Sequence, residues 1–219
     1  YLSIARPDSL FITDLQEKFQ TAGIEVKNSN LGQLPETTWF HYPSDYLGDI
    51  VHSLNVRSDN LYAESVLRLL SLSVHEKGSA EKGIDIIRKY WQNYEADSLE
   101  LFMYDGSGLA RNNKVSAKYL NCVLKETARD SLIGEYFVQT LPLAGKEGSV
   151  ATFMKHGELP GELRLKSGSM SDVHAYAGYY TTPQNRYAIV VMINNYTCTR
   201  DQLKQKISTL LTQVLSKKE

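Results

Sequence analysis

The stretch LRLKSGSMSDVHAYAGYY, Leu163 to Tyr180, decides the fold of this chain. It holds two apolar runs, each of strand length, joined by a polar segment rich in serine and glycine. A third apolar run, Arg186 to Ile193, follows the turn-forming residues Pro183-Gln184-Asn185. The three runs predict an antiparallel meander with strands at 163–166, 174–181 and 186–193.

Helical patterns stand on both sides of this meander. Apolar residues recur at intervals of three and four in several earlier segments, and again in a closing segment that ends in Lys217-Lys218. Several helices, three antiparallel strands and a last helix predict an α+β fold with helices packed on a sheet. The expected helices cover 9–22, 46–56, 60–74, 79–94, 116–129, 131–141 and 201–215, with a short strand at 24–26 and an extended run at 39–42.

The bulk composition excludes several classes of protein. A formal net charge of −1, with Lys and Arg scattered through 219 residues, argues against a nucleic acid or an anionic lipid as partner. Cys122, Cys198 and the five histidines lack metal-ligand spacing, so we expect neither a disulfide framework nor a metal site. No stretch reaches the roughly 20 apolar residues of a membrane span, and the N-terminus lacks the features of a signal peptide. Because the sequence opens without Met, as a piece of a longer precursor would, export stays open.

The triplet Ser58-Asp59-Asn60 lies between two expected helices. Ser, Asp and Asn are preferred helix N-caps, so capping alone would explain such residues here. The functional interpretation is that Ser58 and Asn60 point into one cleft. There the hydroxyl would relay a proton and the amide would hold a substrate carbonyl.

The triplet Lys166-Ser167-Gly168 ends the first expected strand. A solvated lysine and a turn glycine at a strand end are its plain structural interpretation. The functional interpretation needs an edge strand along a cleft, where Lys166 gives a positive charge, Ser167 binds a substrate carboxylate and Gly168 lets the acyl group approach. The backbone N–H of Ser169 would then form part of an oxyanion hole.

Two further serine motifs have structural interpretations. The run Asp105-Gly106-Ser107-Gly108 does not match G-x-S-x-G, and we expect a tight turn in which the aspartate bonds backbone amides. The single S-x-x-K string, Ser79-Ala80-Glu81-Lys82, opens a helix behind a glycine and comes after Ser58. We therefore interpret Ser79 as a helix cap.

The two functional triplets belong together in a known pattern. β-Lactamases and penicillin-binding proteins combine S-x-x-K with S-x-N and K-[ST]-G, and this chain has the second and third elements in that order. The chain resembles the D-alanyl-D-alanine carboxypeptidase/endopeptidase family, the low-molecular-mass class C penicillin-binding proteins. The resemblance rests on the two triplets and on the surrounding segments SDNLYAESVLR, DGSGLARNN, LPLAGKEGSV and LRLKSGSMSDVHAYAGYY. The resemblance runs from about Leu10 to Asn195, and Ser167 stands where the family usually has Thr.

This resemblance implies both a fold and an activity. Residues 1–219 would be the C-terminal part of one penicillin-binding, β-lactamase-like transpeptidase domain, without the N-terminal strands, the S-x-x-K helix and the inserted domains. That absence would explain why only three strands are expected. By resemblance, Ser58 and Asn60 are the S-x-N residues, and Lys166, Ser167 and Gly168 form the K-[ST]-G strand. The implied activity is serine-type D-Ala-D-Ala carboxypeptidase or endopeptidase action on peptidoglycan stem peptides through an acyl-enzyme, with no cofactor and at a periplasmic or other extracytoplasmic location.

The resemblance also implies partners and leaves alternatives open. The partners would be stem peptides, β-lactam antibiotics for the full-length protein, and either the missing N-terminal part or a second copy of the chain. We expect the segment alone to be inactive, because no S-x-x-K precedes Ser58 and the string at 79–82 is assigned to a helix cap. A β-lactamase or esterase of the same fold remains possible, as does a non-catalytic module that binds cell-wall peptides.

Overall fold

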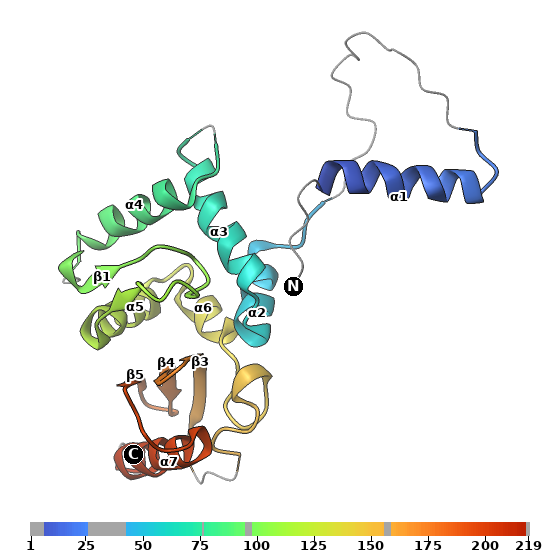
Figure 1. The fold of residues 1–219 in the computed structure, drawn as a ribbon. Coiled ribbons are helices and arrows are strands. Elements are labelled where there is room, and N and C mark those ends of the chain that lie inside the picture. Colours follow the sequence, from blue (N-terminus) through green and yellow to red (C-terminus); the bar gives the residue numbers. More distant parts are fainter. Residues whose placement is uncertain (1–6, 26–42, 76, 95–97, 156–158, 218–219) are drawn as a thin grey trace. The chain divides into compact units, whose positions relative to one another are not determined.

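The computed structural model describes residues 7–25, 43–75, 77–94, 98–155 and 159–217, and it divides into two compact units, Tyr1–Pro43 and Ser44–Glu219 (Figure 1). In the first unit, helix α1 spans Pro7–Thr21 and ends before Gly23, whose φ of +72° is in the left-handed region. Gly23 thus ends the helix as predicted. Residues 24 and 25 form no strand, contrary to our expectation, and residues 26 and 39–42 lie outside the described part.

The second unit contains the other helices of the described chain. Asp59, Ser79 and Ser116 each cap a helix by accepting a backbone N–H with the side chain. The predicted cap at Ser131 is wrong: Asp130 Oδ1 accepts the N–H groups of Leu132 and Ile133 instead, and the helix starts later. No helix of the described residues is long and apolar enough to cross a membrane. The helices of the second unit are α2 (Leu47–Arg57), α3 (Asn60–Leu72), α4 (Ala80–Trp91), α5 (Ala117–Arg129), α6 (Gly134–Thr140) and α7 (Arg200–Leu215).

The predicted meander forms the main sheet. Its strands β3 (Glu162–Met170), β4 (Val173–Thr181) and β5 (Arg186–Asn194) pair antiparallel in the order β3-β4-β5. Strand β3 runs four residues further than predicted, because residues 167–170 continue the regular pairing with β4. The triplet at 166–168 therefore lies inside the strand and not at its end. A second, two-stranded sheet of β1 (Leu101–Phe102) and β2 (Lys114–Val115) was not predicted from the sequence.

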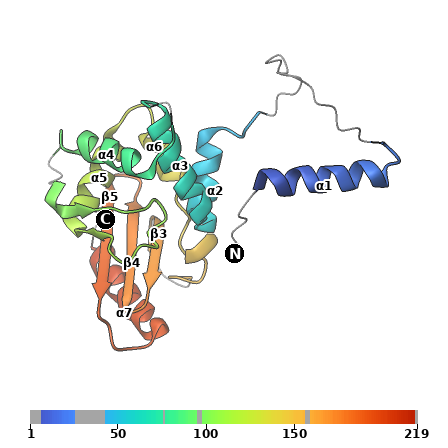
Figure 2. The ribbon, with the colours of Figure 1, turned by 45° about the horizontal axis from the view of Figure 1, so that its top comes forward.

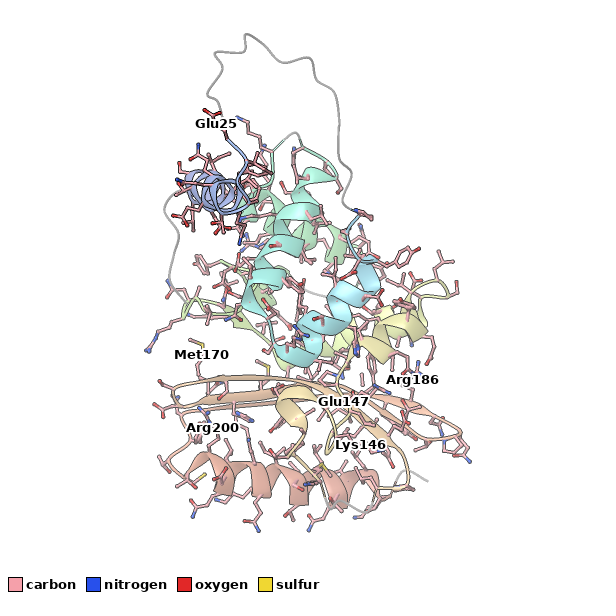
Figure 3. The ribbon with its side chains drawn as sticks, turned by 90° about the vertical axis from the view of Figure 1, so that its right-hand side faces the viewer. Glu25, Lys146, Glu147, Met170, Arg186 and Arg200 are labelled. Carbon is pink, nitrogen blue, oxygen red and sulfur yellow. The ribbon has the colours of Figure 1, made fainter. Side chains whose placement is uncertain are left out.

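The main sheet is covered on both faces (Figures 2 and 3). Alternate side chains of β3 and β4 pack against α7 on one face. On the other face, Tyr179 packs with Leu124 of α5 and Val138 of α6, and its hydroxyl donates to the Leu124 carbonyl at 2.7 Å. The α7 core contains Val150, Phe153, Leu163, Leu165, Tyr176, Tyr180, Leu203, Ile207, Leu211 and Leu215.

The two outer edges of the sheet differ. Beside β3, Leu165 donates its N–H to the carbonyl of Pro142 at 3.0 Å, and Ala144 donates to the carbonyl of Leu163 at 2.8 Å. These bonds cover the first half of that edge only. Strand β5 has no neighbouring strand on its outer side among the described residues, as the small predicted sheet implies.

Candidate active site

Ser58 is presented by an unusual turn between two helices. It ends α2 in the left-handed conformation, with φ 54° and ψ 49°, and its N–H bonds the carbonyl of Leu54. Such a backbone is uncommon outside glycine, asparagine and aspartate. Asp59 caps α3 by accepting the N–H of Tyr62 at 3.1 Å, and Asn60 is the first residue of that helix. The capping interpretation thus accounts for Asp59, while Ser58 and Asn60 have exposed side chains.

Lys166 reaches Ser58 from the sheet. The side chains of Leu163 and Leu165 are buried on the α7 side, so the alternation of β3 directs Lys166 to the opposite face. Its Nζ lies 2.8 Å from Ser58 Oγ and 2.7 Å from the carbonyl oxygen of Ser167. The ammonium can donate to both oxygens. The two residues lie together, which agrees with the assignment of both triplets to one known pattern.

The environment of Lys166 also affects its protonation. The side chain is half-buried, and burial lowers the pKa of its ammonium group below the ordinary lysine value. The group can therefore give up its proton more readily than a solvated lysine. That property suits a lysine that exchanges protons with a neighbouring hydroxyl.

Ser167 has a partner that the sequence analysis missed. Its Oγ lies 2.7 Å from the Oγ of Ser149, in the short helix η2 (Gly148–Val150). Gly148 has φ +51°, and a Cβ there would clash with the carbonyl oxygen of Val56 at the end of α2. The candidate site therefore joins three segments: the end of α2, η2 and the middle of β3. The only sequence signal for η2 was the word LPLAGKEGSV, which contributed to the resemblance.

The far half of β3 presents its backbone to the open edge. Because Leu165 donates its N–H outward to Pro142, the alternation of an antiparallel strand turns the N–H groups of Ser167 and Ser169 the same way. A Cβ added to Gly168 would meet no heavy atom within 4 Å. Packing among the described residues therefore does not require glycine at this position. The open space beside it is available to a ligand.

The 105–108 turn is structural, as predicted. Asp105 accepts the N–H of Gly108 at 2.8 Å and that of Ala110 at 2.6 Å. The hydroxyl of Ser107 donates to Glu64 Oε1 at 2.9 Å, and the Gly106 and Ser107 amides donate to the same oxygen. Glu64, another residue that the sequence analysis missed, thus ties this turn to α3, one helical turn beyond Asn60.

The S-x-x-K string at 79–82 also has its predicted structural role. Ser79 Oγ accepts the backbone N–H of Lys82 at 3.4 Å and caps α4. The hydroxyl is thus used at a helix start.

Comparison with known proteins identifies the family. The model of the D-Ala-D-Ala carboxypeptidase 3 (S13) family matches residues 1–217. The chain belongs to this family. The resemblance that the motifs of this sequence indicated is therefore confirmed, and the S13 family is one of carboxypeptidases and penicillin-binding proteins.

This S13 chain matches part of two longer relatives. It is 25% identical over 193 residues to a D-alanyl-D-alanine carboxypeptidase of Actinomadura sp. (strain R39), covering 83% of this chain and 36% of that protein. It is 25% identical over 218 residues to the D-alanyl-D-alanine carboxypeptidase DacB of Haemophilus influenzae, covering 95% of this chain and 45% of DacB. The chain thus spans less than half the length of these relatives.

Solved structures confirm the fold of this S13 chain. Penicillin binding protein 4 (dacB) from Haemophilus influenzae superposes with a TM-score of 0.76 at 23% identity, over 97% of this chain and 50% of that one. The penicillin G acylated Bd3459 predatory endopeptidase from Bdellovibrio bacteriovorus gives a TM-score of 0.61 at 18% identity, over 98% and 60%. The α+β prediction is confirmed, and the match covers about half of the penicillin-binding protein 4 chain.

Proposed function

We propose that this chain supplies the S-x-N and K-[ST]-G elements of a serine-type D-Ala-D-Ala carboxypeptidase or endopeptidase that acts on peptidoglycan stem peptides. The observation that carries the proposal is the 2.8 Å contact between Lys166 Nζ and Ser58 Oγ, two groups 108 residues apart. In an S13 chain, a lysine and a serine from these two motifs are suited to move a proton during acyl transfer.

The nucleophile belongs to a part of the protein outside this sequence. The sequence holds one S-x-x-K string, and Ser79 of that string caps α4. In the proposed reaction the nucleophilic serine gives its hydroxyl proton to the lysine amine of its own S-x-x-K motif. Its Oγ bonds to the carbonyl carbon of the penultimate D-Ala, and the bond from that carbon to the terminal D-Ala nitrogen breaks. Water then attacks the ester and releases the shortened peptide. The segment alone is inactive because it lacks this serine.

Ser58 and Lys166 move the proton that the leaving amine needs. The Lys166 ammonium donates to Ser58 Oγ, so the hydroxyl proton of Ser58 is free to pass to the amine nitrogen. Lys166, with its lowered pKa, replaces that proton from its ammonium group. The side-chain amide of Asn60, two residues along the same turn, holds the backbone of the stem peptide.

The outer part of β3 binds the reacting end of the substrate. The Ser167 hydroxyl and the positive charge of Lys166 hold the terminal carboxylate. The open space at Gly168 takes the acyl group. The N–H of Ser169, on the open edge of the strand, shares the oxyanion with the N–H of the nucleophile. None of these roles requires a metal or an organic cofactor.

The proposed substrate also implies the setting. Peptidoglycan is assembled outside the cytoplasm, so we place the full-length enzyme in the periplasm or another extracytoplasmic compartment. β-Lactams would acylate the same serine. The alternatives are a β-lactamase or esterase of this fold and a non-catalytic module for cell-wall peptides.

The decisive experiment uses the full-length protein. Incubation with penicillin G, followed by intact-mass measurement and peptide mapping, is expected to give one adduct on a serine outside residues 1–219. The 219-residue chain, treated in parallel, should carry none. An adduct on Ser79 or Ser107 would contradict the assignment of the nucleophile. Release of D-Ala from a D-Ala-D-Ala peptide, with slow turnover of penicillin, supports the peptidase over the β-lactamase; no adduct and no release supports the binding module.

A further inference from the structure

Ser149 stands at the candidate site without a role in either motif. Its Oγ lies 2.7 Å from the Oγ of Ser167, the hydroxyl that the proposed function assigns to the substrate carboxylate. The two serines come from different segments, η2 and β3, and 18 residues separate them in the sequence. The contact places the Ser149 hydroxyl within hydrogen-bonding distance of the Ser167 hydroxyl.

The backbone around Ser149 is held firmly. Gly148 packs directly on the Val56 carbonyl, so the start of η2 is fixed against the end of α2. The side chain of Val150 is completely buried in the α7 core. Just before η2, the carboxylate of Glu147 accepts the N–H of Leu143 at 2.8 Å, and Figure 3 shows Glu147 beside the sheet. The side chain of Ser149 is exposed, but the residues on both sides of it are packed against the protein. Its hydroxyl therefore lies at a defined position.

Ser167 needs such a neighbour to direct its single proton. A hydroxyl rotates freely unless a partner fixes it, and it can donate to only one acceptor at a time. The Lys166 ammonium binds the backbone carbonyl of Ser167 and not its hydroxyl, so Lys166 does not orient that group. If Ser149 donates to Ser167 Oγ, the proton of Ser167 remains available for an incoming carboxylate.

We propose that Ser149 is a positioning residue that donates its hydroxyl proton to Ser167 Oγ and thereby directs the Ser167 proton at the terminal carboxylate of the substrate. The inference rests on the proposed function. It adds a carboxylate-sensing hydroxyl pair, one member of which lies outside the motifs. The effect of Ser149 is confined to substrates that carry the carboxylate.

The test compares two substrates and three variants in the full-length protein. The substrates are a D-Ala-D-Ala peptide and the same peptide with a terminal carboxamide. Ser149→Ala should lower kcat/KM for the carboxylate peptide by about five- to tenfold, mainly through KM, and leave the carboxamide peptide unchanged. Ser149→Thr, which keeps a hydroxyl at an exposed position, should restore most of the loss. Ser131→Ala, at an exposed serine between α5 and α6, is the matched control and should behave as wild type.

A double variant shows whether Ser149 acts through Ser167. The effects of Ser149→Ala and Ser167→Ala on the carboxylate peptide should be strongly non-additive, because the first acts only through the second. Additive losses, equal losses with both substrates, or no loss at all would overturn the inference while leaving the proposed function intact. A wild-type protein that neither releases D-Ala nor reacts with penicillin would overturn the proposed function and this inference together.

Discussion

The ammonium nitrogen of Lys166 lies 2.8 Å from the hydroxyl oxygen of Ser58, so a residue in the middle of β3 meets a residue at the end of α2. Lys166→Met in the full-length protein should lower kcat/KM for D-Ala release by about 10²- to 10⁴-fold, because the donor to Ser58 is lost. Lys118→Met, at an exposed lysine of α5, is the control and should leave the rate unchanged. Wild-type rates in Lys166→Met would contradict the proton relay.

The pH dependence of the reaction should report the lowered pKa of Lys166. Its ammonium form donates to Ser58, and burial makes that form less stable than in free lysine, whose pKa is about 10.4. We therefore expect kcat/KM to fall as pH rises through a value below the ordinary lysine pKa. Lys166→Arg, whose guanidinium stays charged, should lower the maximum and remove this basic limb. Persistence of the same limb in the arginine variant would assign it to another group.

Glu64 should stabilise the fold around Asn60. Burial opposes its ionisation, but hydrogen bonds from Ser107, Arg68 and the Gly106 amide together hold the pKa of the Glu64 carboxyl below its usual value. Glu64→Gln should lower the free energy of unfolding by about 1–3 kcal/mol, because an amide oxygen accepts these bonds less strongly. Denaturant unfolding measures this, with the exposed Glu81→Gln of α4 as control. Equal stability of the two variants would refute the anchoring role.

His174 should make the stability of the protein sensitive to acid. Its ring is buried beside Tyr176, and neither ring nitrogen has a hydrogen-bond partner among the described residues. Burial, aided by the positive charges of Lys204 and Arg200, lowers the pKa of the imidazole below its usual 6.5. The folded state therefore keeps His174 neutral while the unfolded chain takes up a proton.

The direction of this effect follows from proton linkage. The contribution of His174 is fully present above pH 6.5 and is lost as pH falls from there toward the folded-state pKa. His174→Phe should remove this part of the acid sensitivity, whereas His52→Phe, at an exposed histidine of α2, should keep it. The measurement is denaturant unfolding between pH 5 and 8. A steeper loss of stability in His174→Phe than in the wild type would reverse the assignment.

The outer edge of β5 should make the isolated 219-residue chain associate or unfold easily. That edge has no strand beside it among the described residues, and α7 exposes Leu210 and Val214. We expect light scattering to report species larger than a monomer, or a broad thermal transition. We propose that another segment of the full-length protein, or a second copy of this chain, covers the edge. A monomeric chain with a sharp transition would count against this prediction.

The sequence alone predicted the parts of the structure that carry strong local signals. Apolar runs of strand length, two of them joined by a turn signal, revealed the meander, and Ser79 and Asp105 were correctly assigned to a cap and a turn. The Ser58–Lys166 contact could be expected because both triplets belong to one known pattern. Ser131 was assigned as a cap wrongly, since Asp130 beside it is an equally good acceptor of backbone amides.

Other parts of the site could not be predicted because their signals are tertiary. Glu64 looks like any helix carboxylate until the 105–108 turn, 42 residues later, folds back onto it. Ser149 lies in a short helix, and only its packing against α2 and β3 reveals its hydroxyl near Ser167. The extra length of β3 depends on pairing with β4, which the glycine- and serine-rich sequence does not indicate by itself.

The left-handed backbone of Ser58 determines which substitution removes its hydroxyl cleanly. Serine already carries a Cβ in this conformation, so alanine keeps the Cβ and removes the hydroxyl alone. Glycine adopts φ 54° freely, but it also deletes the Cβ and makes the unfolded chain more flexible. Ser58→Gly would therefore mix the loss of the hydroxyl with a change in the turn that leads into Asn60. For this protein the informative knock-out is Ser58→Ala, with Ser58→Asn as the variant that suits the left-handed turn and changes the functional group.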